Sequence, residues 1–143
     1  MVEIVVERWS TEAETRRVVK TLETDGEKAL LKLLQDIRPR VGYVRYLRTD
    51  DSMPPEERQF NLEYAFESVG EDSRRIVLAA EANLTFPNRV DYPIRVIEMR
   101  FGTNGVGEGR LSKARVGFSN GRKILELADY RNGLVCLREI RRQ

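Results

Sequence analysis

The chain has 143 residues, which suits a single domain over residues 1–143 with a continuous core. It contains no histidine and only one cysteine, which excludes Ser-His and Cys-His nucleophile pairs, an internal disulfide and a structural zinc site. The net charge is only +2, but residues 1–71 hold 11 basic and 15 acidic groups, whereas residues 72–143 hold 14 and 8. We expect no metal and no cofactor, and Cys136 is predicted to pack as a small hydrophobic side chain.

No apolar run reaches the roughly eighteen residues that a membrane-spanning helix needs, so no transmembrane segment is expected. Residues 1–7 alternate like a strand and carry acidic groups where a signal peptide is basic. We therefore interpret the chain as a mature soluble domain, in which Met1 is either native or replaces a removed leader.

The first half of the chain predicts a strand followed by a helical hairpin. Residues 2–9 alternate apolar and polar side chains, and Thr11 with Glu14 forms a capping-box pattern at the start of a helix. Asp25-Gly26 interrupts that helix, and a second helix ends before Pro39. The second helix carries an apolar stripe at the i, i+3, i+4, i+7 spacing, formed by Leu30, Leu33, Leu34 and Ile37.

The remainder of the chain predicts antiparallel strands. Expected strands cover residues 41–47, 60–67, 75–83, 94–101, 108–118, 123–130 and 134–141. Asn-Gly steps, which suit tight hairpin turns, separate the last four into a meander; they are Asn104-Gly105, Asn120-Gly121 and Asn132-Gly133. In the cleanest strand one face is formed by Phe60, Leu62, Tyr64 and Phe66.

These elements predict an α+β fold, in which about eight strands form a curved antiparallel sheet or barrel with an N-terminal helical hairpin. The alternative is a two-layer arrangement with both helices packed on one face of the sheet. A set of closely spaced glycines superficially resembles a phosphate-binding loop, but strand signals lie on both sides, so a hairpin and a bulge are expected. That set is Gly102, Gly105, Gly107 and Gly109.

Charged residues alternate with apolar ones on two of the predicted strands. Glu98 and Arg100 share a face, as do Glu108 and Arg110, so adjacent strands can build an Arg/Glu ladder by cross-strand pairing. If that face lies inside a barrel, the ions line a polar pocket; if it lies outside, they are surface pairs. Acidic residues such as Glu126 interrupt the basic second half, so no nucleic-acid partner is expected.

Several segments resemble a family of exported bacterial proteins of unknown function. The resemblance rests on Arg8-Trp9-Ser10-Thr11, on residues 25–31, on residues 74–79, on Asp91-Tyr92-Pro93 and on residues 97–100 and 107–112. It implies a periplasmic or secreted location, with a leader peptide preceding the first strand, although a cytoplasmic location stays open. It implies no reaction and no functional residue.

We therefore expect a non-enzymatic domain that binds a small or lipid-like ligand, or a protein partner, in or on the curved sheet. The expected ligand-binding residues are Tyr64, Tyr92, Glu98 and Arg100. The alternative is a histidine-free enzyme that uses Asp91, Glu98 or Glu108 as acid or base, with help from Tyr92 and Arg100.

Overall fold

The computed structural model describes residues 2–47, 59–81, 94–131 and 135–141, with the backbone alone at 81, 135–139 and 141. The predicted packing of Cys136 therefore lies outside the described side chains. The fold is α+β, as the sequence predicted. In chain order the elements are β1 (Val2–Val6), α1 (Glu12–Asp25), α2 (Glu27–Asp36), β2 (Gly42–Tyr46), β3 (Gln59–Val69), β4 (Arg74–Glu81), β5 (Ile94–Phe101), β6 (Val106–Ser112), β7 (Ala114–Ser119), β8 (Arg122–Leu127) and β9 (Val135–Arg141).

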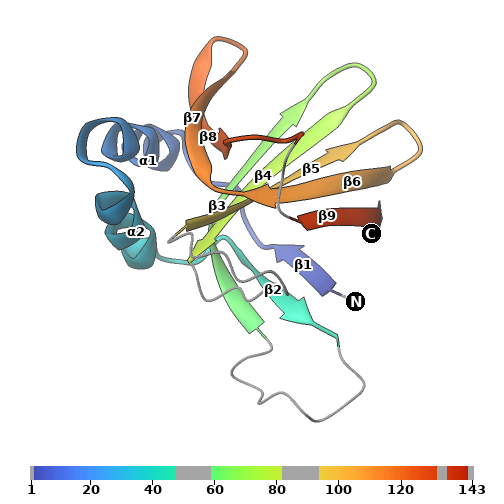
Figure 1. The fold of residues 1–143 in the computed structure, drawn as a ribbon, viewed down its shortest axis with the longest axis horizontal. Coiled ribbons are helices and arrows are strands. Elements are labelled where there is room, and N and C mark those ends of the chain that lie inside the picture. The colour runs from blue at the N-terminus through green and yellow to red at the C-terminus, as the bar shows by residue number, and fades with distance from the viewer. Residues whose placement is uncertain (1, 48–58, 82–93, 132–134, 142–143) are drawn as a thin grey trace.

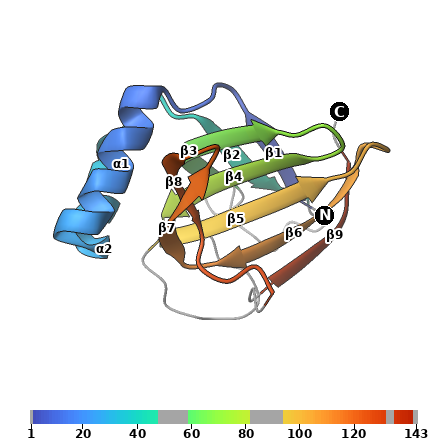
Figure 2. The same ribbon diagram turned by 90° about the horizontal axis from the view of Figure 1, so that it is seen from above.

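Seven strands form one antiparallel sheet in the order β1-β2-β3-β4-β5-β6-β9. The sheet curls into a half-barrel with β1 and β9 at its edges (Figure 1). In the described part of the chain these edge strands do not pair with each other, so the barrel stays open. β7 and β8 form a separate hairpin, which lies with the two helices at one end of the sheet (Figure 2). No helix in the described segments is long and apolar enough to cross a membrane.

Two hydrophobic cores lie on the two faces of the sheet. The inner core fills the concave side of the half-barrel and consists of Val41, Val44, Leu62, Ala65, Ile76, Leu78, Ala80, Ile97, Met99, Phe101 and Leu111. The outer core joins the opposite face to the helices and the hairpin and consists of Val18, Leu30, Leu34, Ile37, Tyr64, Val77, Ala79, Ile94, Val96, Ala114, Leu125 and Leu127. The helices and the hairpin thus bury an apolar face that the curled sheet leaves uncovered.

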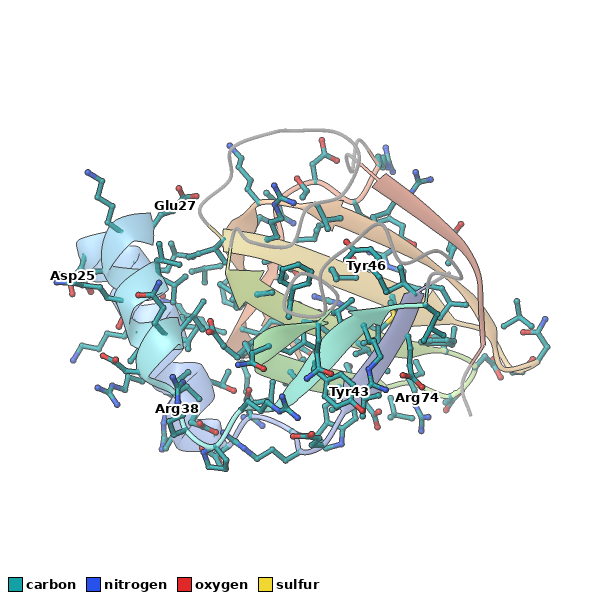
Figure 3. All side chains as sticks on the ribbon, turned by 90° about the horizontal axis from the view of Figure 1, so that it is seen from below. Asp25, Glu27, Arg38, Tyr43, Tyr46 and Arg74 are labelled. Carbon is teal, nitrogen blue, oxygen red and sulfur yellow. The ribbon has the colours of Figure 1, made fainter. Side chains whose placement is uncertain are left out.

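The helical pair forms as the sequence predicted. The Thr11 hydroxyl accepts a hydrogen bond from the Glu14 amide at 3.1 Å, and the Glu14 carboxylate accepts one from the Thr11 amide at 2.9 Å. Gly26 separates the helices with a φ of 85°, a conformation that favours glycine. Asp25 and Glu27 flank this junction at one end of the pair, and Arg38 lies at the other end (Figure 3).

A β-bulge changes the expected direction of side chains in β3. Leu62 lies opposite Ala80, but Tyr64 lies opposite Ala79, so Glu63 is an extra residue. Leu62 therefore packs in the inner core and Tyr64 in the outer core. The prediction that they share one face was wrong, because simple alternation holds only for a strand without a bulge.

The expected four-strand meander is also wrong. The predicted strand 108–118 is two strands, β6 and β7, separated at Lys113, and β9 rather than β7 pairs with β6. The chain leaves the sheet at Lys113 and places Ala114 and Leu125 over the outer core. The Asn-Gly turns at 104–105 and 120–121 close β5–β6 and β7–β8, whereas Asn132-Gly133 lies outside the described residues.

Candidate functional site

A ladder of arginines and glutamates crosses the outer face of the half-barrel on β5 and β6. Glu98 lies directly opposite Arg110, and Arg100 lies directly opposite Glu108. The register is the one that the sequence predicted, but the described side chains form no ion pair across it, because Glu98 pairs with Arg75 and Arg100 instead. Val96, which shares this face, belongs to the outer core. The ladder therefore lies on the outside of the half-barrel and not within it. It borders the outer core on the side that faces solvent.

Glu98 is the buried centre of the ladder, with only 2% of its surface exposed. Its Oε1 lies 2.6 Å from Nε of Arg75 in an ion pair without regular hydrogen-bond geometry. Its Oε2 accepts a hydrogen bond from Arg100 at 3.0 Å. Both oxygens of this buried carboxylate are therefore held by cations, which offsets the cost of removing its charge from water.

The β7–β8 hairpin is attached to the same group of ions. Glu126 on β8 lies 2.7 Å from Arg75 and 2.9 Å from Arg115. Consecutive contacts thus link Arg100, Glu98, Arg75, Glu126 and Arg115, and we call these residues the ion chain. The ion chain joins the half-barrel to the hairpin by charge, in addition to the apolar contacts of the outer core.

Tyr130 covers the exposed end of the ladder. The guanidinium carbon of Arg100 lies 3.8 Å from the centroid of its ring, and its hydroxyl donates a hydrogen bond to Glu108 at 3.3 Å. Partial burial is the largest cause that raises the pKa of Tyr130, and the Glu108 carboxylate raises it further. The hydroxyl therefore stays a donor at neutral pH, and the aromatic ring holds Arg100 in place.

The enzyme hypothesis gains little support from this geometry. A general acid or base must offer an oxygen to the substrate, whereas arginines engage both oxygens of Glu98. Glu108 is exposed and bonded to Tyr130. Asp91 and Tyr92 lie outside the described residues. Within the described residues, no cluster of three or more carboxylates or other ligating groups is placed to hold a metal ion.

Tyr64, the remaining expected ligand-binding residue, is fully buried in the outer core. Burial raises the pKa of Tyr64 to about 12. Its hydroxyl lies close enough to the Leu125 backbone and the Thr15 side chain for both to lower this pKa slightly. Neither contact has regular hydrogen-bond geometry. Tyr64 thus lies beneath α1 and the hairpin, while Glu98 and Arg100 meet in the ladder.

The sequence analysis missed two buried charges, one at the bulge of β3 and one on the concave side of β5. Glu63 and Arg95 are 3% and 6% exposed. Burial raises the pKa of Tyr46, and the charge of Arg95 opposes this shift, so Arg95 and Tyr46 lie near each other. Tyr46 in turn packs edge-to-face against Phe60 at 5.9 Å. The described concave side is therefore a packed core with charge at one end.

Sequence reasoning also missed a groove between α1 and the start of β8. It has a volume of about 520 Å³ and is lined by Glu12, Thr15, Arg16, Val19, Lys20, Glu23, Thr24, Arg122 and Lys123. We call it the α1–β8 groove. One signal for it existed in the sequence, because Arg16 and Lys20 are four residues apart and share a helix face. The opposite wall of the groove comes from β8, which is distant in the sequence, so the sequence alone could not place it beside α1.

Comparisons with protein-family models, with curated proteins and with solved structures found no match. The suspected exported family and the envelope location that it implies therefore stay predictions.

Proposed function

We propose that this protein is a binding domain whose ligand is a small molecule with more than one anionic group, held in the α1–β8 groove. One observation carries the proposal: among the described residues, four cationic side chains and two carboxylates surround a hollow of about 520 Å³. This volume lies within the roughly 300–1,000 Å³ of typical small-molecule sites. The proposal narrows the sequence-based expectation of a small or lipid-like ligand or a protein partner.

The carboxylates of the groove are already engaged across it. Arg122 lies 3.7 Å from Glu12, and Lys123 lies 3.0 Å from Glu23. Arg16, one of the two other groove cations, is exposed on α1 and forms no ion pair with a described residue. The same holds for Lys20, the other cation of the helix wall. These two side chains supply the uncompensated positive charge.

The groove suits a polar ligand better than a lipid chain. Val19 is the only aliphatic residue among the described residues that line it. Glu12 and Glu23 lie eleven positions apart on α1, which corresponds to roughly 16 Å along the helix axis. Arg16 and Lys20 lie between these ion pairs and are only four positions, or roughly 6 Å, apart along the axis, so a small molecule with two anionic groups would contact both.

Isothermal titration calorimetry with inorganic pyrophosphate at low ionic strength tests the proposal. The double variant Arg16→Ala with Lys20→Ala should weaken binding by about tenfold or more, since charge-assisted hydrogen bonds contribute about 1.5–3 kcal/mol each. The matched control is Lys28→Ala with Lys32→Ala, which removes the same charge from exposed positions on α2. The control should bind like the wild type, and added salt should weaken both. Equal weakening in both variants, or no binding by the wild type, would contradict the proposal.

A further inference from the structure

We infer that Arg110, with Arg100 and Tyr130, forms a seat for the carboxylate of a small organic acid on the outer face of the half-barrel. We call these three residues the carboxylate seat. The inference concerns a surface on β5 and β6 and does not depend on the α1–β8 groove.

The charges of the ladder and the ion chain do not balance. Their cations are Arg75, Arg100, Arg110 and Arg115, and their carboxylates are Glu98, Glu108 and Glu126. Among the described side chains, this set of ions is therefore one carboxylate short. An external carboxylate would complete it.

Arg110 is the cation of this set that has no carboxylate partner among the described side chains. Glu98 lies opposite it in the register but forms ion pairs with Arg75 and Arg100 instead. Within the described residues, Arg110 forms no ion pair, and its Nε is buried without a hydrogen-bond partner. The ring of Tyr130 is one of its described neighbours, and the ring centroid lies 5.9 Å from the guanidinium carbon of Arg110.

A buried donor without an acceptor is unfavourable, and a ligand that supplies the acceptor removes that cost. The Arg110 guanidinium is planar and matches a carboxylate with two parallel hydrogen bonds. Because Nε itself is covered, the ligand reaches the terminal nitrogens first, and a small movement of the guanidinium then brings Nε into the pair. Arg100, whose side chain is 51% exposed, offers a second cation at the rim.

Glu108 limits the charge of the ligand. It is exposed on β6, two residues before Arg110, and accepts a hydrogen bond from Tyr130. A fixed negative charge at this position repels a second anionic group on the ligand. The seat therefore favours a single carboxylate, whereas the α1–β8 groove favours several anionic groups.

Nuclear magnetic resonance of the arginine Nε–Hε groups tests the seat directly, with sodium benzoate as the probe. The cross-peak that Arg110→Met removes is assigned to Arg110. On titration of the wild type, this cross-peak should move in a saturable manner, because its proton gains an acceptor and the benzoate ring shifts nearby nuclei. Arg110→Lys keeps the charge but loses the planar fork, and it should lose the saturable response of the Arg100 cross-peak.

Two controls separate this inference from the proposed function and from misfolding. Arg17→Met removes one exposed charge from α1 and should leave the benzoate response of Arg110 unchanged. Arg110→Met should keep the wild-type affinity for pyrophosphate. Its melting temperature should be no lower than that of the wild type, because the substitution removes a cation that forms no ion pair with the described residues. An Arg110 cross-peak that does not move, or that moves linearly together with all other arginine cross-peaks, would overturn the inference.

Discussion

The carboxylate of Glu126 occupies the space that a side chain on Gly117 would need. A Cβ built on Gly117 would overlap Cδ and both carboxylate oxygens of Glu126. Glu126 is held in this position by Arg75 and Arg115. The missing side chain of Gly117 therefore allows the ion chain to continue from the half-barrel into the hairpin.

Gly117→Ala should displace Glu126 from both arginines. We expect a loss of about 1–3 kcal/mol in the free energy of unfolding, as for other disrupted partly buried ion pairs. Urea denaturation measures it. Gly102→Ala is the matched control, because its Cβ would meet Asn104 at an ordinary 3.5 Å, and it should change stability much less. Equal effects of the two substitutions would show that Glu126 moves aside without cost.

Two neighbouring leucines on α2 should differ sharply in their importance. Leu34 is fully buried in the outer core, whereas Leu33 is only partly buried at its margin. Leu34→Ala should cost about 2–5 kcal/mol as a core truncation. Leu33→Ala should cost clearly less, and thermal or urea unfolding of both variants measures the difference. Similar losses would mean that Leu33 is better packed than its position at the margin indicates.

Glu14 should make the stability of the fold sensitive to acid. Hydrogen bonding to Arg8 is the main cause that lowers the pKa of Glu14 below its ordinary value of 4.5. Because the folded-state pKa is the lower one, this carboxylate stabilises the fold above pH 4.5, and the contribution disappears as the pH falls through the folded-state value.

Glu14→Gln removes this charge but can keep the capping-box hydrogen bond. It should therefore cost up to about 1 kcal/mol near pH 7 and less at acidic pH, as measured by urea denaturation at both values. The control is Glu27→Gln, which removes one exposed carboxylate from the first turn of α2 and should cost less than Glu14→Gln near pH 7. A difference between wild type and Glu14→Gln that is the same at both pH values would contradict the assignment to the Glu14 charge.

Tyr64 should make the fold sensitive to alkali. Its folded-state pKa of about 12 lies above the ordinary value of 10.0, so burial of the protonated hydroxyl contributes stability that is lost as the pH rises between these values. Tyr64→Phe should be nearly neutral at pH 8, since the hydroxyl lacks a regular partner, and relatively more stable than the wild type near pH 11.

Denaturation curves at both pH values measure this crossover, with Tyr43→Phe on the outer surface as the control. A large loss of stability in Tyr64→Phe at pH 8 would show that the hydroxyl has a strong hydrogen bond after all.

Individual elements of this fold could be predicted where the signal is local. The strand over 94–101 coincides with β5, and the capping box at Thr11 lies where the sequence placed it. The bulge at Glu63 and the break at Lys113 could not be predicted. Both features depend on how the two faces of the curled sheet are buried by other elements. That burial is a property of the assembled fold and not of the local sequence.

The candidate sites also differ in how far the sequence predicts them, because one depends on local alternation and the other on distant segments. Side-chain alternation alone put Glu98 and Arg100 on one face, and the register then placed Arg110 opposite Glu98. The α1–β8 groove joins Arg16 to Arg122, which lie far apart in the sequence and meet only because the hairpin folds back beside the helix. No local pattern carries that information.

The bulge in β3 makes one position of the sheet dispensable. Leu62 pairs with Ala80 and Tyr64 with Ala79, so a chain without Glu63 would form a continuous ladder through the same partners. Deletion of Glu63 would therefore leave every apolar residue of β3 on its present face. Deletion of Ala65, in contrast, would turn Phe66 toward the inner core. The strand can therefore lose Glu63 without changing which side chains face each core. It can lose Ala65 only if the side chains that follow move to the opposite face.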